Sequence, residues 1–150
     1  MSDRLVVFAL GEQRYALPLS AVERIVRAVA VTSLPQAPDI VLGIVNVQGQ
    51  VTPVINLRRR FRLAEHEIDL SDQLVIARTV RRTVALVVDA VIGVLEYAEQ
   101  EIVEGQDLLP ELRYVEGVAK FDDGLILIHN LDKLLSLEEE TVLQQALESA

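Results

Sequence analysis

The sequence of 150 residues contains no cysteine and no tryptophan, and it has only three tyrosines and three phenylalanines. The lack of cysteine excludes disulfides, thiolate chemistry and cysteine-based zinc sites. No apolar run approaches the ~18 residues of a membrane-spanning helix. The apolar run 5–10 is too short for the core of a signal peptide, and no small-residue cleavage site follows it. We therefore expect a cytoplasmic protein with no direct membrane insertion.

Positive charge is outnumbered: 14 Lys and Arg residues, of which two are lysines, stand against 23 Asp and Glu residues, for a formal net charge of −9. Nucleic-acid binding depends on Lys and Arg neutralising phosphates and, for single strands, on aromatic stacking, so both counts argue against it. One dense basic run spans residues 58–62. It could be a solvated face, a set of caps on the carbonyls of a short helical turn, or a docking patch for an acidic protein surface.

Motifs of catalysis are absent: there is no Gly-rich phosphate loop, serine elbow or His-Glu-x-x-His, and no carboxylate cluster with metal-ligand spacing. His66 lies between Glu65 and Glu67, where a solvated loop residue is the simplest interpretation. A small hydrolase or metal-dependent enzyme would have to use His129 and Asp89, but neither has a partner in sequence that completes a catalytic set. We predict no catalytic residue, no metal and no cofactor, and a packed His129.

Aliphatic residues are abundant: apolar residues make up 51% of the chain and valine occurs 22 times. Short apolar runs separated by turn signals predict an all-β fold, as in a barrel or sandwich. An N-cap at Ser136 with Glu139 three residues later predicts a capping box and an amphipathic helix over 137–148. The acidic stretch 96–113 is expected to be irregular. The predicted strands are 5–10, 14–18, 24–31, 40–47, 50–57, 73–79, 83–88, 90–95, 114–121 and 124–130.

The chain repeats itself once. Residues 5–27 align with 74–96 at an offset of 69, and residues 41–61 align with 115–135 at an offset of 74. Repeating a whole supersecondary unit produces two similar lobes with a seam between them. Val22, Ile25 and Val26 have apolar counterparts in the second copy, so both lobes can line that seam, either as an internal core or as the floor of a groove for an amphipathic helix. The identities are Leu5/Leu74, Val6/Val75, Ala16/Ala85, Leu17/Leu86, Ala21/Ala90, Val22/Val91, Val41/Val115, Gly43/Gly117, Asn56/Asn130 and Leu57/Leu131.

The order and spacing of several motifs resemble a known family over residues 4–136. The motifs are LVVFALG at 5–11, YALPL at 15–19, LPxAP at 34–38, VxGIVN at 41–46, GxVxPVI at 49–55, LRxRF at 57–61, ALVVDxV at 85–91 and GVAK at 117–120. Together they are similar to CheW-type chemotaxis coupling proteins and to the homologous regulatory domain of the chemotaxis histidine kinase. Met1 and the closing helix favour a free-standing protein over a kinase fragment.

The resemblance implies a fold of two SH3-like five-stranded β-barrels with a hydrophobic seam. On this basis a CheW-like domain spans 1–136. Lobe one covers about 13–80, and lobe two covers about 1–12 together with 81–136, because the family's first strand can complete the second barrel. Residues 137–150 form the C-terminal helix and tail.

The resemblance further implies a non-enzymatic signalling adaptor, recruited to membrane receptor arrays. Its partners would be the cytoplasmic tip of a methyl-accepting chemoreceptor, held in the groove, and the regulatory domain of the histidine kinase. Arg58 and Asp89 belong to motifs near the lobe surfaces and are possible kinase contacts. The receptor-groove candidates are Val22, Ile25, Val26, Val45 and Gln48.

Three positions depart from the family pattern. Gln48 stands where the family usually has an arginine that matters for receptor coupling, Asn56 stands where an aspartate is common, and Arg62 stands where glycine is common. The loss of the arginine implies an altered receptor interaction, for example in a pilus-motility-type chemosensory pathway.

Overall fold

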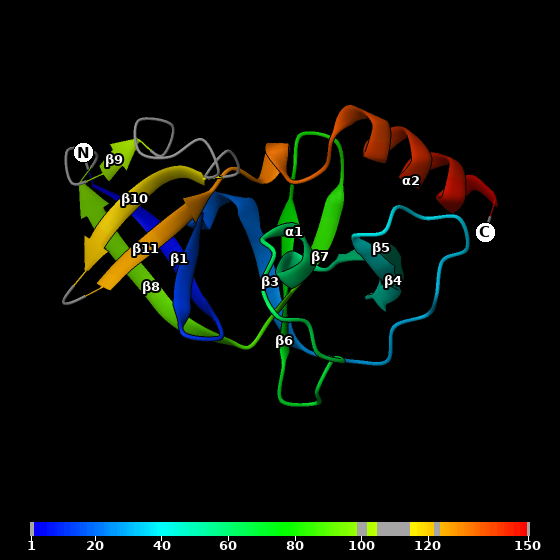
Figure 1. The fold of residues 1–150 in the computed structure, drawn as a ribbon, viewed down its shortest axis with the longest axis horizontal. Coiled ribbons are helices and arrows are strands. Elements are labelled where there is room, and N and C mark those ends of the chain that lie inside the picture. The colour runs from blue at the N-terminus through cyan, green and yellow to red at the C-terminus, as the bar shows by residue number, and fades with distance from the viewer. Residues whose placement is uncertain (1, 99–101, 105–114, 122–123, 150) are drawn as a thin grey trace.

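The computed structural model describes residues 2–98, 102–104, 115–121 and 124–149, and the predicted all-β class is confirmed within these ranges (Figure 1). None of the helices described there is long and apolar enough to cross a bilayer. The elements are β1 (Ser2–Leu10), β2 (Gln13–Pro18), β3 (Val22–Arg27), β4 (Val41–Val47), β5 (Gln50–Ile55), α1 (Leu57–Arg60), β6 (Gln73–Arg78), β7 (Thr83–Val88), β8 (Ala90–Ala98), β9 (Ile102–Glu104), β10 (Val115–Phe121), β11 (Gly124–His129) and α2 (Leu137–Ser149).

The strands form two lobes, each built on one sheet. The first sheet has the order β8-β1-β2-β11-β10-β9, and the second has the order β3-β6-β7-β5-β4. Figure 1 shows the six-stranded sheet on the left and the five-stranded sheet to its right. Two lobes were predicted, and they are confirmed.

The two sheets are open rather than the closed barrels that were predicted. Among the described residues, strand pairing ends at β8 and β9 in one sheet and at β3 and β4 in the other. A single bridge between Thr32 and Ile44 adds to the edge of the five-stranded sheet at β4. The segment that follows Thr32 contains Pro35 and Pro38, which have no backbone N–H to donate to a ladder.

The two sequence repeats exchange hairpins. The β1–β2 hairpin of the first repeat pairs in parallel with β11 of the second, and the β6–β7 hairpin of the second repeat pairs in parallel with β5 of the first. Each sheet therefore combines two strands of one repeat with the remaining strands of the other. Lobe boundaries consequently differ from the predicted ones, since β2 lies in the six-stranded sheet and β7 in the five-stranded sheet.

The duplication extends to the irregularities of the ladders. The β3–β6 pair shifts register between Val22 and Arg24, and the β8–β1 pair shifts at the equivalent place, between Val7 and Phe8. The β4–β5 and β10–β11 hairpins likewise carry a bulge at matching positions. Bulges re-aim side chains and increase local twist, so both lobes bend in the same way at the same points.

In the part of the chain that the structure describes, buried apolar side chains form three clusters. One cluster inside each lobe has equivalent members in the two repeats, such as Leu74 and Ile76 in the five-stranded lobe and Leu5 and Val7 in the other. The third and largest, which we call the central core, joins the two exchanged hairpins and the helical elements. Because the central core is filled by residues of both hairpins, the lobes form one packed unit. Its buried members include Phe8, Leu10, Tyr15, Leu17, Val75, Ala77, Val84, Leu86 and Val88.

Gly43 marks a close approach of two backbone segments. Its φ is +154°, and a Cβ atom at this position would lie 2.2 Å from the carbonyl oxygen of Thr32 and 2.7 Å from Cγ1 of Val31. The same residue lies in the bulge of the β4–β5 hairpin. Glycine is needed because any side chain would occupy the space of the Thr32 backbone.

Helix α1 begins and ends with recognisable caps. Asn56 accepts a hydrogen bond from the Arg59 amide at 3.1 Å. In the second repeat, Asn130 caps the 3₁₀ turn Leu131–Lys133 by accepting a hydrogen bond from the Asp132 amide. At the C-terminal end the Leu63 amide donates to the Arg58 carbonyl, and the Arg62 amide donates to the Arg59 carbonyl. This is a Schellman motif, whose left-handed residue is usually glycine. Here it is Arg62, with φ +58°.

Replacing Arg62 by glycine should raise the free energy of unfolding by about 0.5–1 kcal/mol. A non-glycine residue in the left-handed region costs about 1–2 kcal/mol, and the greater freedom of glycine in the unfolded chain offsets part of that gain. Urea denaturation measures the change. Arg62→Ala is the matched control, because it removes the same side chain but keeps the unfavourable φ, and it should give no gain.

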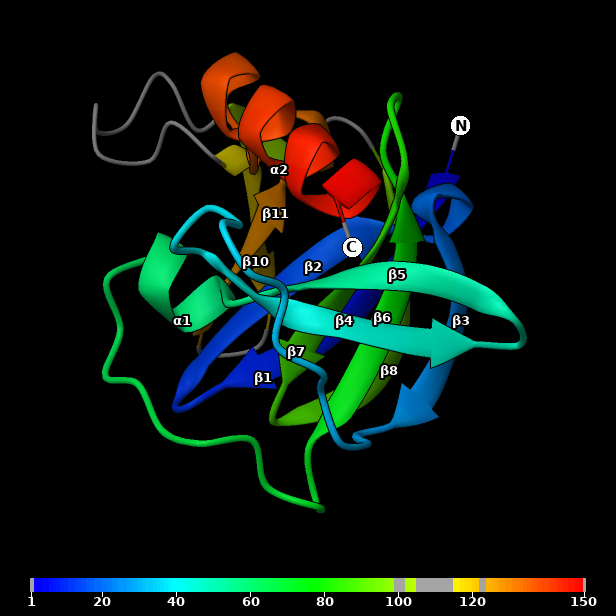
Figure 2. The same ribbon diagram turned by 90° about the vertical axis from the view of Figure 1, so that its right-hand side faces the viewer.

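Helix α2 packs against the central core, as the burial of Leu143 and Ala146 indicates. Figures 1 and 2 both show it lying over the end of the molecule that contains β5. The predicted capping box is confirmed: the Glu139 amide donates to Ser136 Oγ at 3.1 Å, and the Ser136 amide donates to Glu139 Oε1 at 2.9 Å. Leu137, the first residue of the helix, is exposed and lies outside this buried face.

Two ion pairs fasten this helix. Arg60 contacts Glu139 at 2.6 Å and Arg82 contacts Glu140 at 2.9 Å. Burial would raise the pKa of Glu139, but the hydrogen bond from the Ser136 amide and the contact with Arg60 lower it below its usual value. Arg60, within the basic run, therefore anchors α2 and is not part of a wholly solvated face.

The acidic stretch predicted to be irregular is partly strand, because β8 continues to Ala98 and β9 covers Ile102–Glu104. Pairing of β8 with β1 and of β9 with β10 accounts for both segments. The remainder of that stretch lies outside the described residues.

Candidate functional site

Three of the predicted groove residues, Val22, Ile25 and Val26, lie on the edge strand β3, and their counterparts lie on the edge strand β8. In β3, Ile25 pairs with Val75 of the central core, whereas Val26 pairs with Leu74 of the lobe core. Directly paired residues of an antiparallel ladder point to the same side of the sheet, so Ile25 and Val26 face opposite sides. Val22 packs half-buried against the central core.

The predicted groove set is therefore divided by the sheet. Val45 is buried and packs in the lobe core together with Val26. It supports β4 from inside and offers no surface to a partner. The alternation of β4 explains this, because Val45 is buried as Gly43 is, while Asn46 next to it is exposed.

The second repeat supplies the matching residues on β8. Val91 packs half-buried against the central core as Val22 does, and Leu95 packs in its lobe core as Val26 does. Val94 is the counterpart of Ile25, and both are exposed, at 59% and 39% respectively. We call Val22, Ile25, Val91 and Val94 the seam residues. Val94 was not among the predicted site residues, although the alignment of the two repeats already pointed to it.

Gln48 lies in the turn of the β4–β5 hairpin. It and Gly49 both have positive φ, +50° and +85°, and Asn46 Oδ1 accepts a hydrogen bond from the Gly49 amide at 2.7 Å. Two consecutive positive φ values are those of a type I′ turn, which suits the twist of a two-residue hairpin. The turn presents an uncharged, exposed amide side chain at this position.

Arg58 and Asp89 bind each other at the junction of the lobes. One guanidinium nitrogen of Arg58, Nη2, contacts both carboxylate oxygens of Asp89 at 2.7 and 2.8 Å, and the Gly11 amide donates to Asp89 Oδ2 at 2.7 Å. Asp89 lies between β7 and β8, and Gly11 turns the β1–β2 hairpin. Burial would raise the pKa of Asp89, but Arg58 and the Gly11 amide lower it below its usual value. The pair therefore ties α1 to the exchanged hairpin.

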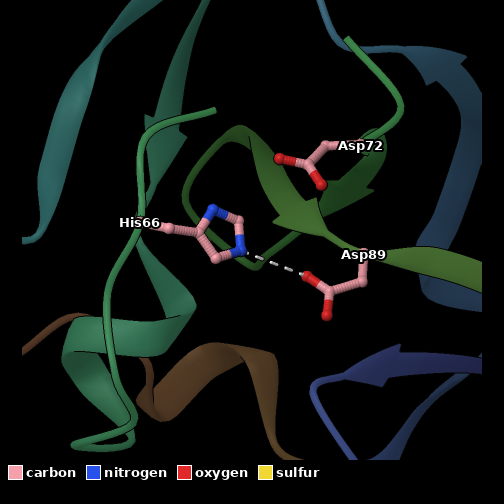
Figure 3. A group of neighbouring side chains, drawn as sticks. All are labelled: His66, Asp72 and Asp89. Carbon is pink, nitrogen blue, oxygen red and sulfur yellow. Dashed lines mark ion pairs between the residues drawn. The ribbon is translucent and has the colours of Figure 1, made fainter. Parts of the chain in front are cut away.

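The connector between the repeats, which we define as residues 64–72, is fastened to α1. Arg58 Nη1 donates to the Ala64 carbonyl at 2.9 Å, while Glu65 accepts hydrogen bonds from Asn56 and Arg59. His66, expected to be a solvated loop residue, is exposed but lies 3.7 Å from Asp89 (Figure 3). The connector is therefore held across the lobe junction.

His129 lies in the interior, as predicted for a packed residue. Its ring is fully buried and is surrounded by Phe61, Tyr15 and Phe8, with ring centroids 4.3, 4.8 and 5.9 Å away. Neither ring nitrogen has a hydrogen-bond partner within the described part of the chain. Burial lowers the pKa of His129 to about 3. Because this ring is shielded from substrate, and Asp89 is engaged by Arg58, the geometry argues against an enzyme that uses His129 and Asp89.

The family model described as the CheW-like domain matches residues 4–139. The chain belongs to the CheW-like family. It is 27% identical over 142 residues to a chemotaxis protein CheW from Treponema pallidum, covering 91% of this chain and 84% of the relative. It is 28% identical over 137 residues to the CheW protein of Rhizobium meliloti, covering 90% and 88%.

A solved structure gives the same result for the fold. The chain superposes on the crystal structure of the scaffolding protein TtCheW from Thermoanaerobacter tengcongensis with a TM-score of 0.83 and 31% identity, over 93% of this chain and 91% of that one. Membership of this family makes the chain a chemosensory coupling protein, built as a scaffold. The fold described above is therefore shared with that structure.

Proposed function

We propose that this CheW-like chain is a non-catalytic adaptor that couples the cytoplasmic tip of a chemoreceptor to a histidine kinase at membrane receptor arrays. The observation that carries the proposal is the matched exposure of Ile25 and Val94. These residues occupy equivalent places on the two edge strands beside the central core. An amphipathic helical partner recognises aliphatic side chains of this kind.

The kinase regulatory domain needs a surface away from the seam residues. Val51, on β5 next to the edge strand β4, is 57% exposed and offers such an anchor on the five-stranded lobe. Arg58 and Asp89 form hydrogen bonds with each other, so they would support a kinase contact indirectly, by fixing the geometry of the lobe junction. Transient signalling contacts bury modest areas, and we expect a Kd on the order of micromolar for each partner.

Ile25→Asp should weaken binding of a receptor-tip fragment by about tenfold and leave binding of the kinase regulatory domain unchanged, because it places a charge in a desolvated apolar contact. Val51→Asp should have the opposite selectivity. Isothermal titration of each variant against each purified partner tests the proposal. Leu70→Asp is the matched control, since Leu70 is an aliphatic residue 85% exposed in the connector. Folded variants with unchanged affinities for both partners would refute it.

The uncharged turn at Gln48 supports a second, narrower proposal, that this adaptor serves a divergent pathway such as a pilus-motility-type chemosensory system. Gln48→Arg should then tighten binding to a receptor tip of the common flagellar type by several-fold, because it restores the charge that most of the family carries. Gln50→Arg, an exposed glutamine in the same hairpin, controls for net charge. Equal effects of the two substitutions would show that the position has no special role.

A further inference from the structure

Three possible metal ligands converge beside the lobe junction. His66 comes from the connector, Asp72 from the residue before β6, and Asp89 from the residue between β7 and β8. One potential ligand atom of each lies within 4.8 Å of the other two. Figure 3 shows the imidazole edge of His66 turned toward both carboxylates. Residues far apart in sequence therefore present one nitrogen and two oxygens to a common point.

The orientation of His66 is fixed by a group outside this cluster. Its Nδ1 lies 2.7 Å from the carbonyl oxygen of Glu67. A carbonyl can only accept, so Nδ1 carries the proton and donates it. With Nδ1 holding its proton, Nε2 is the nitrogen left to bind a metal ion, and it points toward Asp89 Oδ1, 3.7 Å away. A cation between Nε2 and the carboxylates would be attracted by the nitrogen lone pair and by both negative charges. Donation from Nδ1 to a carbonyl is the usual arrangement of a metal-binding histidine.

Both carboxylates have ligand capacity to spare. Asp72 is buried, and the one hydrogen bond to its carboxylate within the described residues is from the Asp69 amide to Oδ2. In the same part of the chain Asp89 Oδ1, the atom nearest to His66, accepts a hydrogen bond from Arg58 alone. Arg58 contacts both oxygens of Asp89 and holds its orientation, as an outer partner of a metal-binding carboxylate does.

We propose that His66, Asp72 and Asp89 form a binding site for a divalent transition-metal ion of the Zn²⁺ type. One imidazole with two carboxylates is a ligand set that suits zinc, and a fourth position stays open to water because His66 is exposed. The ion would join the connector to a residue that leads into each sheet, since Asp72 precedes β6 and Asp89 precedes β8. Metal binding would thereby fasten the connector across the junction of the two lobes.

The chain has only two histidines, which makes the test direct. Chelator-treated full-length protein is titrated with ZnCl₂ at neutral pH, with calorimetry for affinity and long-range ¹H–¹⁵N NMR for the imidazoles. We expect one Zn²⁺ per chain with a Kd on the order of micromolar, a shift of the His66 nitrogen resonances, and none for the buried His129.

His66→Gln and Asp72→Asn should each weaken Zn²⁺ binding at least tenfold. Asp72→Asn keeps an oxygen for the Asp69 amide, so its fold should be retained. Glu67→Gln is the matched control, because it removes a neighbouring charge and keeps the carbonyl that orients His66. Unchanged His66 resonances at a tenfold excess of Zn²⁺, or equal binding by His66→Gln, would overturn the proposal and assign any uptake to scattered surface carboxylates.

Discussion

Gly43→Ala should lower the free energy of unfolding by roughly 2–4 kcal/mol, the largest single-residue effect that we expect on stability. Two terms combine at this position. The φ of +154° is unfavourable for a residue with a Cβ, and that Cβ would lie 2.2 Å from the Thr32 carbonyl oxygen. The Thr32 carbonyl cannot retreat without cost, because it accepts a hydrogen bond from the Ile44 amide at 2.8 Å.

Gly93→Ala separates the two terms. Gly93 has a φ of +158°, almost the same as Gly43, but no heavy atom lies within 4 Å of the place that its Cβ would take. It should therefore report the cost of the backbone conformation alone, about 1 kcal/mol. Chemical denaturation of both variants measures the difference. Similar losses for the two would show that the segment 31–32 does not press closely on β4.

Lowering the pH from 7 to 5 should cost the protein about 2 kcal/mol of stability through His129 alone. In the unfolded chain His129 titrates near pH 6.5, and in the folded protein its pKa is about 3. Between these values the unfolded state binds a proton that the folded state does not. The contribution of His129 to the free energy of unfolding is therefore fully present above pH 6.5 and is lost as the pH falls from 6.5 toward 3.

His129→Leu removes this dependence and is a suitable probe, because the equivalent position in the first repeat is the buried residue Ile55. The variant should fold, and its free energy of unfolding should change through this site by less than about 0.5 kcal/mol between pH 7 and pH 5. Paired urea titrations at the two pH values give the comparison. Parallel pH profiles for parent and variant would mean that His129 is accessible to protons in the native protein.

The strands, the duplication and the crossing of the first strand to the second lobe could be predicted from the sequence, but the exchange of whole hairpins could not. Apolar runs and turn residues are local signals, and they placed the strands to within a few residues. Each repeat, however, carries an equivalent hairpin, such as Phe8 with Tyr15 or Ala77 with Val84. Pairing within a repeat and pairing between repeats bury similar side chains. Only the three-dimensional packing of the central core decides between them.

The candidate site shows the same limit. Val22 and Ile25 could be identified from the repeat, but a strand places neighbouring residues on opposite sides, and the bulge after Val22 changes which side each one faces. That is why Val26 lines the lobe core. The bond between Arg58 and Asp89 joins residues 31 positions apart, and no pattern along the chain predicts it.

The connector is held more closely than the prediction of a solvated loop residue at His66 implied. Its polar residues bind other parts of the chain: Glu65 with Arg59 and Asn56, and His66 beside Asp89. Polar character alone does not distinguish a free loop from one held by hydrogen bonds. Arg62 is the opposite case, since its departure from the family's glycine was visible in the sequence, and its left-handed φ shows that the backbone keeps the conformation that glycine favours.

A three-component capture assay tests most directly whether one chain holds receptor and kinase at the same time. A receptor-tip fragment is immobilised, the kinase regulatory domain is kept in solution, and this protein is added stepwise. We predict that the kinase domain is retained only when this protein is present, and that Ile25→Asp and Val51→Asp each raise the concentration of this protein needed for half-maximal retention by about tenfold. Retention without this protein, or displacement of the receptor by the kinase domain, would contradict simultaneous coupling.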